Sequence, residues 1–241
     1  MTNETTVSTK QGSVFEDILE LNWAPAAVFE RARNNGVGMY ILVLTMVSIA
    51  IVVATKGLLQ PYIDANFDLQ MAQMARKGQP MPPEAIETAR SFGTWGFIGT
   101  SAFLVPMSAL LGGAILWLAG KVVSAPMRFG QAALIATLGA VPRIMSFLIT
   151  AVQGALVDAA SIRSFYDASL GPARFLDPVT TSPAVMALLA SIDVFSVWQL
   201  VIYGIGVSVV ARVARSTGYI AAVIQWGVTA ALTLIPAVIA G

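Results

Sequence analysis

The sequence predicts an all-α polytopic membrane protein with five transmembrane helices and short interfacial amphipathic helices. The first observation is composition: of the 241 residues, 56% are hydrophobic and only 11% are charged, with a mean hydropathy of +0.75. A soluble domain carries roughly 25% charged residues, so this chain has too little charge to cover a water-facing surface of its size. The second observation is that the apolar residues form five long runs, whereas a membrane β-barrel shows short alternating segments.

Each run is long enough for a helix that crosses a hydrocarbon core of roughly 30 Å. We expect a cytoplasmic N-terminal region over 1–36, a five-helix transmembrane domain over 37–241, and outer loops at about 57–93 and 158–183. In chain order, the five runs cover residues 37–54, 94–119, 129–157, 184–211 and 219–240.

The N-terminal region has the pattern of short helices that lie along a membrane surface. Ser13 and Glu16 match a capping box, and apolar residues follow them at helical spacing. Pro25 can occupy the first turn of a second helix that ends near Arg33. We expect both helices at the cytoplasmic interface with Trp23 at headgroup depth, and the alternative is a simple polar leader.

The first outer loop should hold two helices of its own. Four apolar residues recur at spacings of four, four and three and therefore share one helix face, namely Ile63, Phe67, Met71 and Met74. Gly78 should end this helix, and Pro83 should open a second short helix that leads into the next run. The methionine-bearing face either binds a partner, because such faces repack easily, or packs on the bundle.

Glycines and prolines mark the second and third runs. Gly93, Gly96 and Gly99 open the second run three residues apart, and we expect close helix packing there because small residues let helices approach. Pro106 and Pro142 lie inside the second and third runs, where we expect kinks that neighbouring helices tolerate.

Lysine and arginine in short loops set the expected orientation. The turn between the second and third runs carries Lys121 and Arg128, and the turn between the fourth and fifth carries Arg212 and Arg215. Neither turn contains an acid, and two more arginines precede the first run. We therefore expect a multi-pass membrane protein with the N-terminus in the cytoplasm and the C-terminus outside.

Two ionisable residues fall inside the expected spans, Arg143 in the third and Asp193 in the fourth. A charge at a helix centre costs on the order of 3 kcal/mol, so each should face protein or water and seek a partner. Their depths let them pair, either as a structural ion pair that fixes helix register or as part of an ion or proton path. Four polar residues are expected near the pair: Gln153, Gln199, Ser146 and Thr150.

The chain lacks the residues that most catalytic sites need. It has 0 Cys and 0 His, which excludes thiolate and imidazole catalysis and metal sites built from those ligands. The sequence contains no phosphate-binding loop of the P-loop type. A net charge of +1 gives no general attraction to nucleic acid. We therefore expect no enzyme activity, no cofactor, no metal and no nucleic-acid partner.

Several segments resemble the Yip1 family of membrane proteins in its bacterial form. They are the lead-in LNWAPAAVFER at 21–31, the basic turn GKVVSAPMRFGQA at 120–132, the segment ATLGAVPRIM at 136–145, and SIDVFSVWQL at 191–200, which resembles an Asp-x-Phe-x-x-Trp signature. The Asp-Tyr/Leu-Gly-Pro motif of eukaryotic members is not present, so their vesicle-trafficking roles are not carried over. The family-motif positions are Pro25, Phe29, Pro142, Phe195 and Trp198.

This resemblance implies five helices, a cytoplasmic N-terminus, a location in the cell inner (cytoplasmic) membrane and no known catalysis. Our expectation is a non-enzymatic integral membrane protein in the lipid bilayer, an adaptor or accessory subunit that binds other membrane proteins, a transport complex or a second copy of itself. The alternative is a small-solute or ion permease or channel subunit that uses the Arg143/Asp193 centre. A polar, water-connected cavity at that centre would favour transport, and a dry, packed bundle would favour the adaptor.

Overall fold

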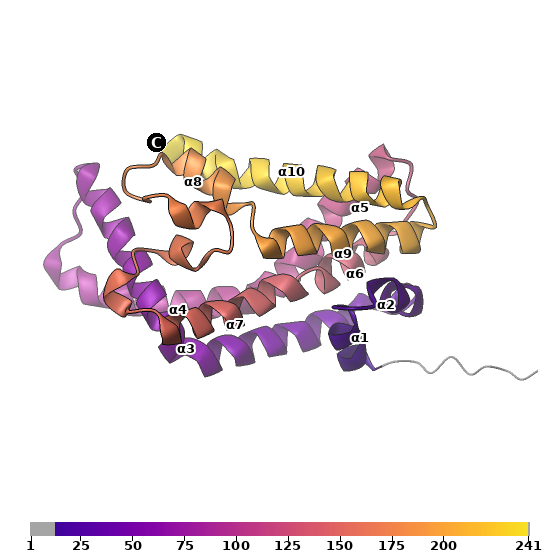
Figure 1. Ribbon diagram of the computed structural model, residues 1–241, viewed down its shortest axis with the longest axis horizontal. Coiled ribbons are helices and arrows are strands. Elements are labelled where there is room, and N and C mark those ends of the chain that lie inside the picture. Colours follow the sequence, from indigo (N-terminus) through magenta and orange to yellow (C-terminus); the bar gives the residue numbers. More distant parts are fainter. Residues whose placement is uncertain (1–12, 241) are drawn as a thin grey trace, which may run out of the picture.

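The computed structural model describes residues 13–240, and over that range the protein is helical and contains no strand (Figure 1). Five helical segments within it are long and apolar enough to cross a membrane, which confirms the expected fold class. The elements in chain order are α1 (Val14–Glu20), α2 (Pro25–Ala32), α3 (Val37–Arg76), α4 (Pro83–Met107), the π-helical turn η1 (Ser108–Gly112), α5 (Gly113–Val122), α6 (Phe129–Leu138), α7 (Val141–Leu156), the 3-10 turns η2 (Ala159–Ser161), η3 (Phe165–Ala168) and η4 (Pro172–Phe175), α8 (Pro183–Ala190), α9 (Val194–Ala211) and α10 (Arg215–Ala240).

The long helices run side by side, so the connections gather at two ends (Figure 1). We call one end the inner end; it holds α1, α2, the α5–α6 turn and the α9–α10 turn. The opposite, outer end holds the α3–α4 connection, the segment with η2 to η4, α8 and the end of α10. The three basic regions of the sequence therefore lie together at the inner end.

The first outer loop, expected at about 57–93, is mostly helix and not a loop. Helix α3 continues without interruption to Arg76, and the chain reverses only between residues 77 and 82, where Gly78 adopts a φ of 73°. Gly78 does end the helix and Pro83 does open the next, as predicted. At about 1.5 Å per residue, a 40-residue helix is roughly twice as long as a hydrocarbon core is thick, so α3 and α4 project beyond it. Pro61 lies inside α3, and Figure 1 shows the helix change direction toward its outer end.

The predicted methionine-bearing face packs along only part of its length. Ile63 is buried in a cluster with Leu59 and Ala151, and the Phe67 ring lies 4.7 Å beneath the Arg90 guanidinium. Met74, closer to the tip, is exposed. The outer half of α3 is therefore held on α4 and α7 at its base and leaves the tip uncovered.

Three of the other runs are broken or distorted. After Pro106 the second run widens into the π-helical turn η1, and the third run stops at Gly139 before Pro142 enters the first turn of α7. Both prolines thus mark distortions, as expected. The prediction of one helix over the fourth run is wrong, because residues 191–193 separate α8 from α9. The second outer loop, 158–183, contains only 3-10 turns before α8 begins at Pro183.

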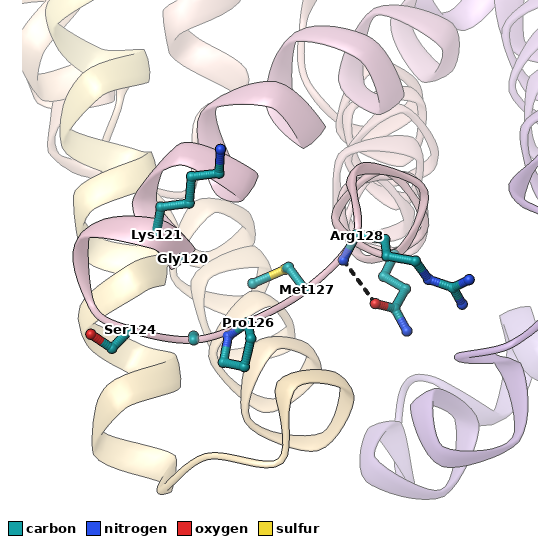
Figure 2. A pocket seen from close by; sticks show the side chains of 8 residues that line it. Gly120, Lys121, Ser124, Pro126, Met127 and Arg128 are labelled. Carbon is teal, nitrogen blue, oxygen red and sulfur yellow. Dashed lines mark hydrogen bonds between the residues drawn. The ribbon is translucent and has the colours of Figure 1, made fainter.

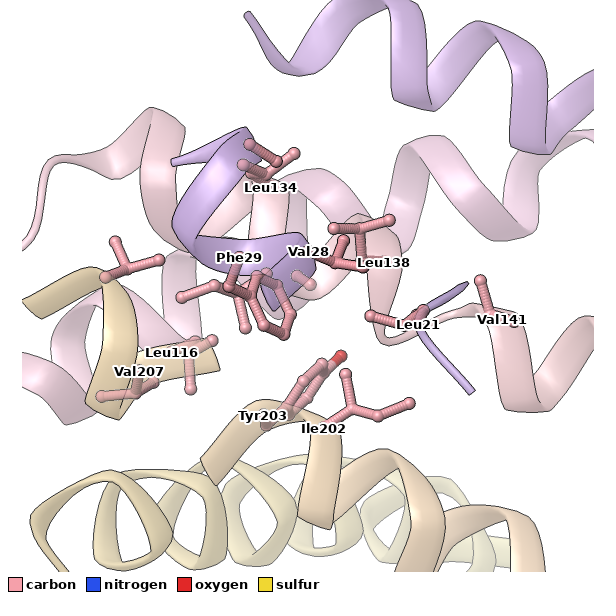
Figure 3. Close-up of a cluster of buried hydrophobic side chains, with 14 of the residues drawn as sticks. Leu21, Val28, Phe29, Leu116, Leu134, Leu138, Val141, Ile202, Tyr203 and Val207 are labelled. Atoms are coloured by element: carbon pink, nitrogen blue, oxygen red, sulfur yellow. The ribbon is translucent and has the colours of Figure 1, made fainter. Parts of the chain in front are cut away.

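The hydrophobic core fills the inner half of the bundle. Figure 3 shows Val28 and Phe29 of α2 pointing into a cluster with Leu134, Tyr203 and Val207, and all five side chains are buried. The N-terminal helices are therefore part of the packed bundle, and their other face stays outward, with Phe15, Leu19 and Trp23 exposed at a spacing of four.

The α5–α6 contact shows how tightly these helices meet. A Cβ built on Gly113 would lie 2.8 Å from the Cα of Ala133. Only glycine permits this separation, because no real Cβ approaches a backbone atom so closely.

Candidate functional site

Arg143 and Asp193 come together, as the sequence predicted, but not inside two continuous spans. Arg143 lies in the first turn of α7, and its Nη1 is 3.8 Å from Oδ2 of Asp193. Asp193 is the N-cap of α9: its Oδ1 accepts from the Ser196 N–H at 2.6 Å, and the Ser196 hydroxyl oxygen accepts from the Asp193 N–H at 2.8 Å. The carboxylate is therefore placed by a helix start, which corrects its expected position within an unbroken helix.

The two charges have unequal surroundings. The Asp193 side chain is 12% exposed and is stabilised by the backbone donors and dipole of α9. The Arg143 side chain is 46% exposed, and its guanidinium has no hydrogen bond with another residue in 13–240. A distance of 3.8 Å is an ion pair without a hydrogen bond, so it constrains Arg143 weakly.

Two cavities meet at Arg143. The first, about 320 Å³, lies between α4, α7, the η3 segment and the α8–α9 break, and Asp193, Ser146 and Thr150 contribute to its wall. The second, about 280 Å³, lies between α7, α8, α9 and α10, and its polar wall includes Gln199. Arg143 lines both cavities. The break between α8 and α9 thus leaves space around a guanidinium, with both apolar and polar side chains in the walls.

Three of the four predicted polar neighbours line the cavities beside Arg143. Gln199 lines the second cavity and donates to the Gly139 carbonyl at 2.9 Å, which satisfies an acceptor freed by the α6–α7 break. Ser146 donates to the Arg143 carbonyl at 2.6 Å, and Thr150 lies on the first cavity. Gln153 is elsewhere: its Nε2 donates to the Ala168 carbonyl at 3.0 Å and fastens η3 to α7.

The five positions that resemble the family motif lie at helix starts or in packed parts of the bundle. Pro25 begins α2, and Pro142 lies buried at the start of α7. Phe29 lies so close to Gly206 that a Cβ there would come within 2.9 Å of its ring. Phe195 is buried in the first turn of α9, and Trp198 packs partly buried against the main core.

A second polar centre lies at the inner end and was not predicted. Asp17 of α1 is 1% exposed; it accepts from Arg31 Nε at 3.0 Å and from the Tyr40 hydroxyl at 2.5 Å. Arg31 also contacts Glu20 at 2.6 Å, and these hydrogen bonds to Glu20 and Asp17 raise the arginine's pKa further above its ordinary value. Asp17 thereby joins α1, α2 and α3, and we call this group the Asp17 clasp.

One face of α4 is uncovered. Five exposed residues between 92 and 103 are spaced by three, one, three and four, so they share a single side of the helix. A Cβ on Gly96 or Gly99 would meet nothing within 4 Å, and at Gly93 it would make one ordinary contact with Phe67, so the expected close packing does not occur within the chain. We call this surface the α4 face, and it consists of Phe92, Trp95, Gly96, Gly99 and Phe103, all exposed.

Comparison with models of known protein families, with curated proteins and with solved structures gives no match to this chain.

Proposed function

We propose that the protein is a non-enzymatic accessory subunit of a membrane complex and binds another membrane protein through the α4 face. The observation that carries this proposal is the pair of uncovered glycines between exposed aromatic side chains. Phe92 and Trp95 stand on one side of Gly96 and Gly99, and Phe103 stands on the other. The face belongs to a helical segment that is long and apolar enough to span a membrane.

Two exposed glycines within a membrane-spanning helix are unfavourable unless another interaction offsets their cost. Each glycine within a helix costs about 1 kcal/mol relative to alanine. Lipid gains nothing from the missing side chain, whereas a second helix can approach the backbone closely and pack against it. The aromatic side chains on either side supply contact area to such a helix.

The closed inner half of the bundle also favours binding over conduction. The cavities at Arg143 lie toward the outer end, between α7 and the helices and turns of that end. Toward the inner end, Leu134, Leu138 and Tyr203 are fully buried in the main core. This arrangement supports a packed scaffold with a recess rather than an open path.

We also propose the inner membrane as the location, with the N-terminus in the cytoplasm and the C-terminus outside. The basic turns at the inner end support this orientation. The exposed row of Phe15, Leu19 and Trp23 supports an interfacial position for α1. Membership of the bacterial Yip1 family remains a proposal that rests on the sequence motifs.

Co-purification in mild detergent tests the partner proposal. We expect the tagged protein to retain a second membrane protein, or a differently tagged copy of itself, and expect Gly96→Leu with Gly99→Leu to release it. Gly57→Leu is the matched control, because Gly57 also lies in a spanning helix and a Cβ there meets nothing within 4 Å. Equal retention by both variants, or no retained chain at all, would contradict the proposal.

Transport is the second candidate, and the two cavities beside Arg143 are the observation that favours it. A permease of small anions would need this guanidinium as its binding charge. Purified protein in liposomes should then move solute, and Arg143→Gln should stop the flux. Flux that survives Arg143→Gln would exclude this centre as the path.

A further inference from the structure

We propose that the groove beside the α5–α6 turn binds the headgroup of an anionic phospholipid, with Lys121 and Arg128 as its cationic contacts. The groove measures about 720 Å³ and is formed by residues between Gly120 and Gln131. Figure 2 shows Lys121 and Arg128 at the two ends of the turn, with Pro126 and Met127 between them. An apolar floor between two cations suits a headgroup that continues into acyl chains.

The backbone of this turn is fixed, so the two cations are held apart at defined places. The Ala125 N–H donates to the Gly120 carbonyl at 2.8 Å, and Ser124 takes a left-handed φ of 56°, which together end α5. The Arg128 N–H donates to Oε1 of Gln131 at 2.9 Å and begins α6 (Figure 2). These bonds engage the backbone and leave the guanidinium of Arg128 for a ligand.

Charge at the inner end is not balanced. The described acids of α1 and α2 are already engaged: Asp17 and Glu20 with Arg31, Glu30 with Arg33, and Glu16 with the Ser13 N–H. Within residues 13–240, four bases on the two neighbouring turns form no salt bridge, namely Lys121, Arg128, Arg212 and Arg215. Lys121 and Arg128 line the groove, and the two arginines of the neighbouring turn add positive charge at the same end, which is complementary to anionic headgroups.

The flank of the groove fits the rest of a lipid. The Lys121 Nζ lies 3.6 Å from the centre of the Trp117 ring, and a tryptophan beside a lysine is typical of headgroup depth. Val122 is 75% exposed, and Leu118, one turn earlier on α5, is also exposed. Acyl chains can lie along this apolar side of α5 while the phosphate stays with the cations.

Binding of short-chain lipids to the purified full chain in a neutral detergent tests the proposal. We expect dioctanoyl phosphatidylglycerol to bind and to raise the unfolding temperature, and expect dioctanoyl phosphatidylcholine and glycerol phosphate to do neither. Removing both cations, by Lys121→Gln with Arg128→Gln, should weaken binding about 25-fold, at roughly 5-fold per base near a lipid surface. The exchange Lys121→Arg with Arg128→Lys should keep it.

The matched control is Arg76→Gln with Arg174→Gln, which makes the same change in charge at the outer end. Equal binding of the two lipids by the unaltered protein would overturn the proposal, and this comparison needs no variant to fold. Equal stabilisation by glycerol phosphate would indicate a site for free phosphate and would also overturn it. An equal loss of affinity in the outer-end control variant and in the Lys121→Gln with Arg128→Gln variant would also overturn the proposal.

Discussion

At the scale of single residues, polar groups act here mainly by organising helix ends. Asp193 caps α9 through Ser196, and Arg143 approaches it only to 3.8 Å. The pairing of these two residues could be predicted from depth along the helices. The cap could not, because a serine three residues after an aspartate lies outside the usual capping-box pattern with glutamate or glutamine.

Substitutions at Asp193 separate capping from charge. Asp193→Ala should lower the free energy of unfolding by about 1 kcal/mol, because it removes the cap of α9. Asp193→Asn should restore most of that loss, because an amide oxygen also caps a helix. Thermal unfolding in detergent measures both. Equal losses for the two variants would mean that the ion pair with Arg143 matters more than the cap.

The Asp17 clasp was missed because its members lie on three helices. Arg31 and Tyr40 are 14 and 23 residues away from Asp17 in sequence, so no helical period connects them. Each looked like an ordinary residue of an interfacial helix or a span. Only the docking of α1 and α2 on α3 brings them together.

Removing the carboxylate of Asp17 should be costly. Asp17→Ala leaves the buried Tyr40 hydroxyl without its acceptor and leaves Arg31 with Glu20 as its only carboxylate partner in 13–240, and we expect a loss of about 2 kcal/mol. Glu20→Ala removes the other, half-buried partner of Arg31, where solvent screening limits the loss to under about 1 kcal/mol. Chemical denaturation in detergent compares the two. A larger effect for Glu20→Ala would contradict the clasp as described.

At the scale of helices, hydrophobic runs predicted which segments span and failed to predict where they break. The run 184–211 reads as one helix, yet residues 191–193 interrupt it. The run 129–157 stops at Gly139, where a Cβ would clash with the ring of Tyr203. Local hydropathy contains neither the capping of α9 by Asp193 nor the packing of Tyr203 against Gly139. In 57–93 the prediction failed in the other direction: the polar residues of this segment indicated a loop, whereas α3 continues through it to Arg76.

Glycines on helices α4 and α5 should respond in opposite ways to a methyl group. Gly113→Ala forces a Cβ against the Ala133 backbone, and we expect a loss of about 1–3 kcal/mol from overpacking. Gly96→Ala meets nothing within 4 Å in this chain and should gain up to about 1 kcal/mol from helix propensity. Unfolding of the two purified variants checks this. Equal effects would contradict the tight α5–α6 contact.

At the scale of the whole molecule, the two ends differ in their charge and in how tightly their helices are packed. The inner end combines docked amphipathic helices, a filled core and uncompensated bases, whereas the outer end combines a projecting hairpin with the cavities at Arg143. The number of spans and the side on which the bases gather could be predicted from composition and loop charge. The uncovered α4 face could not, because the glycine spacing does not say whether the packing partner belongs to the same chain.

Because the chain has 0 Cys, single cysteines can map its orientation. Ser124→Cys in the α5–α6 turn should react with a membrane-impermeant thiol reagent only after the cytoplasmic side is opened. Gln79→Cys in the α3–α4 connection should react from outside in intact cells. The reverse pattern would contradict the proposed orientation.

Photocrosslinking in native membranes tests the accessory-subunit proposal most directly. A photoreactive residue at Phe103 lies on the α4 face, and one at Val53 lies on an exposed position of α3 that serves as the control. We expect Phe103 to yield an adduct of protein mass and Val53 to yield only lipid adducts. Lipid adducts alone at both positions would contradict a partner on the α4 face.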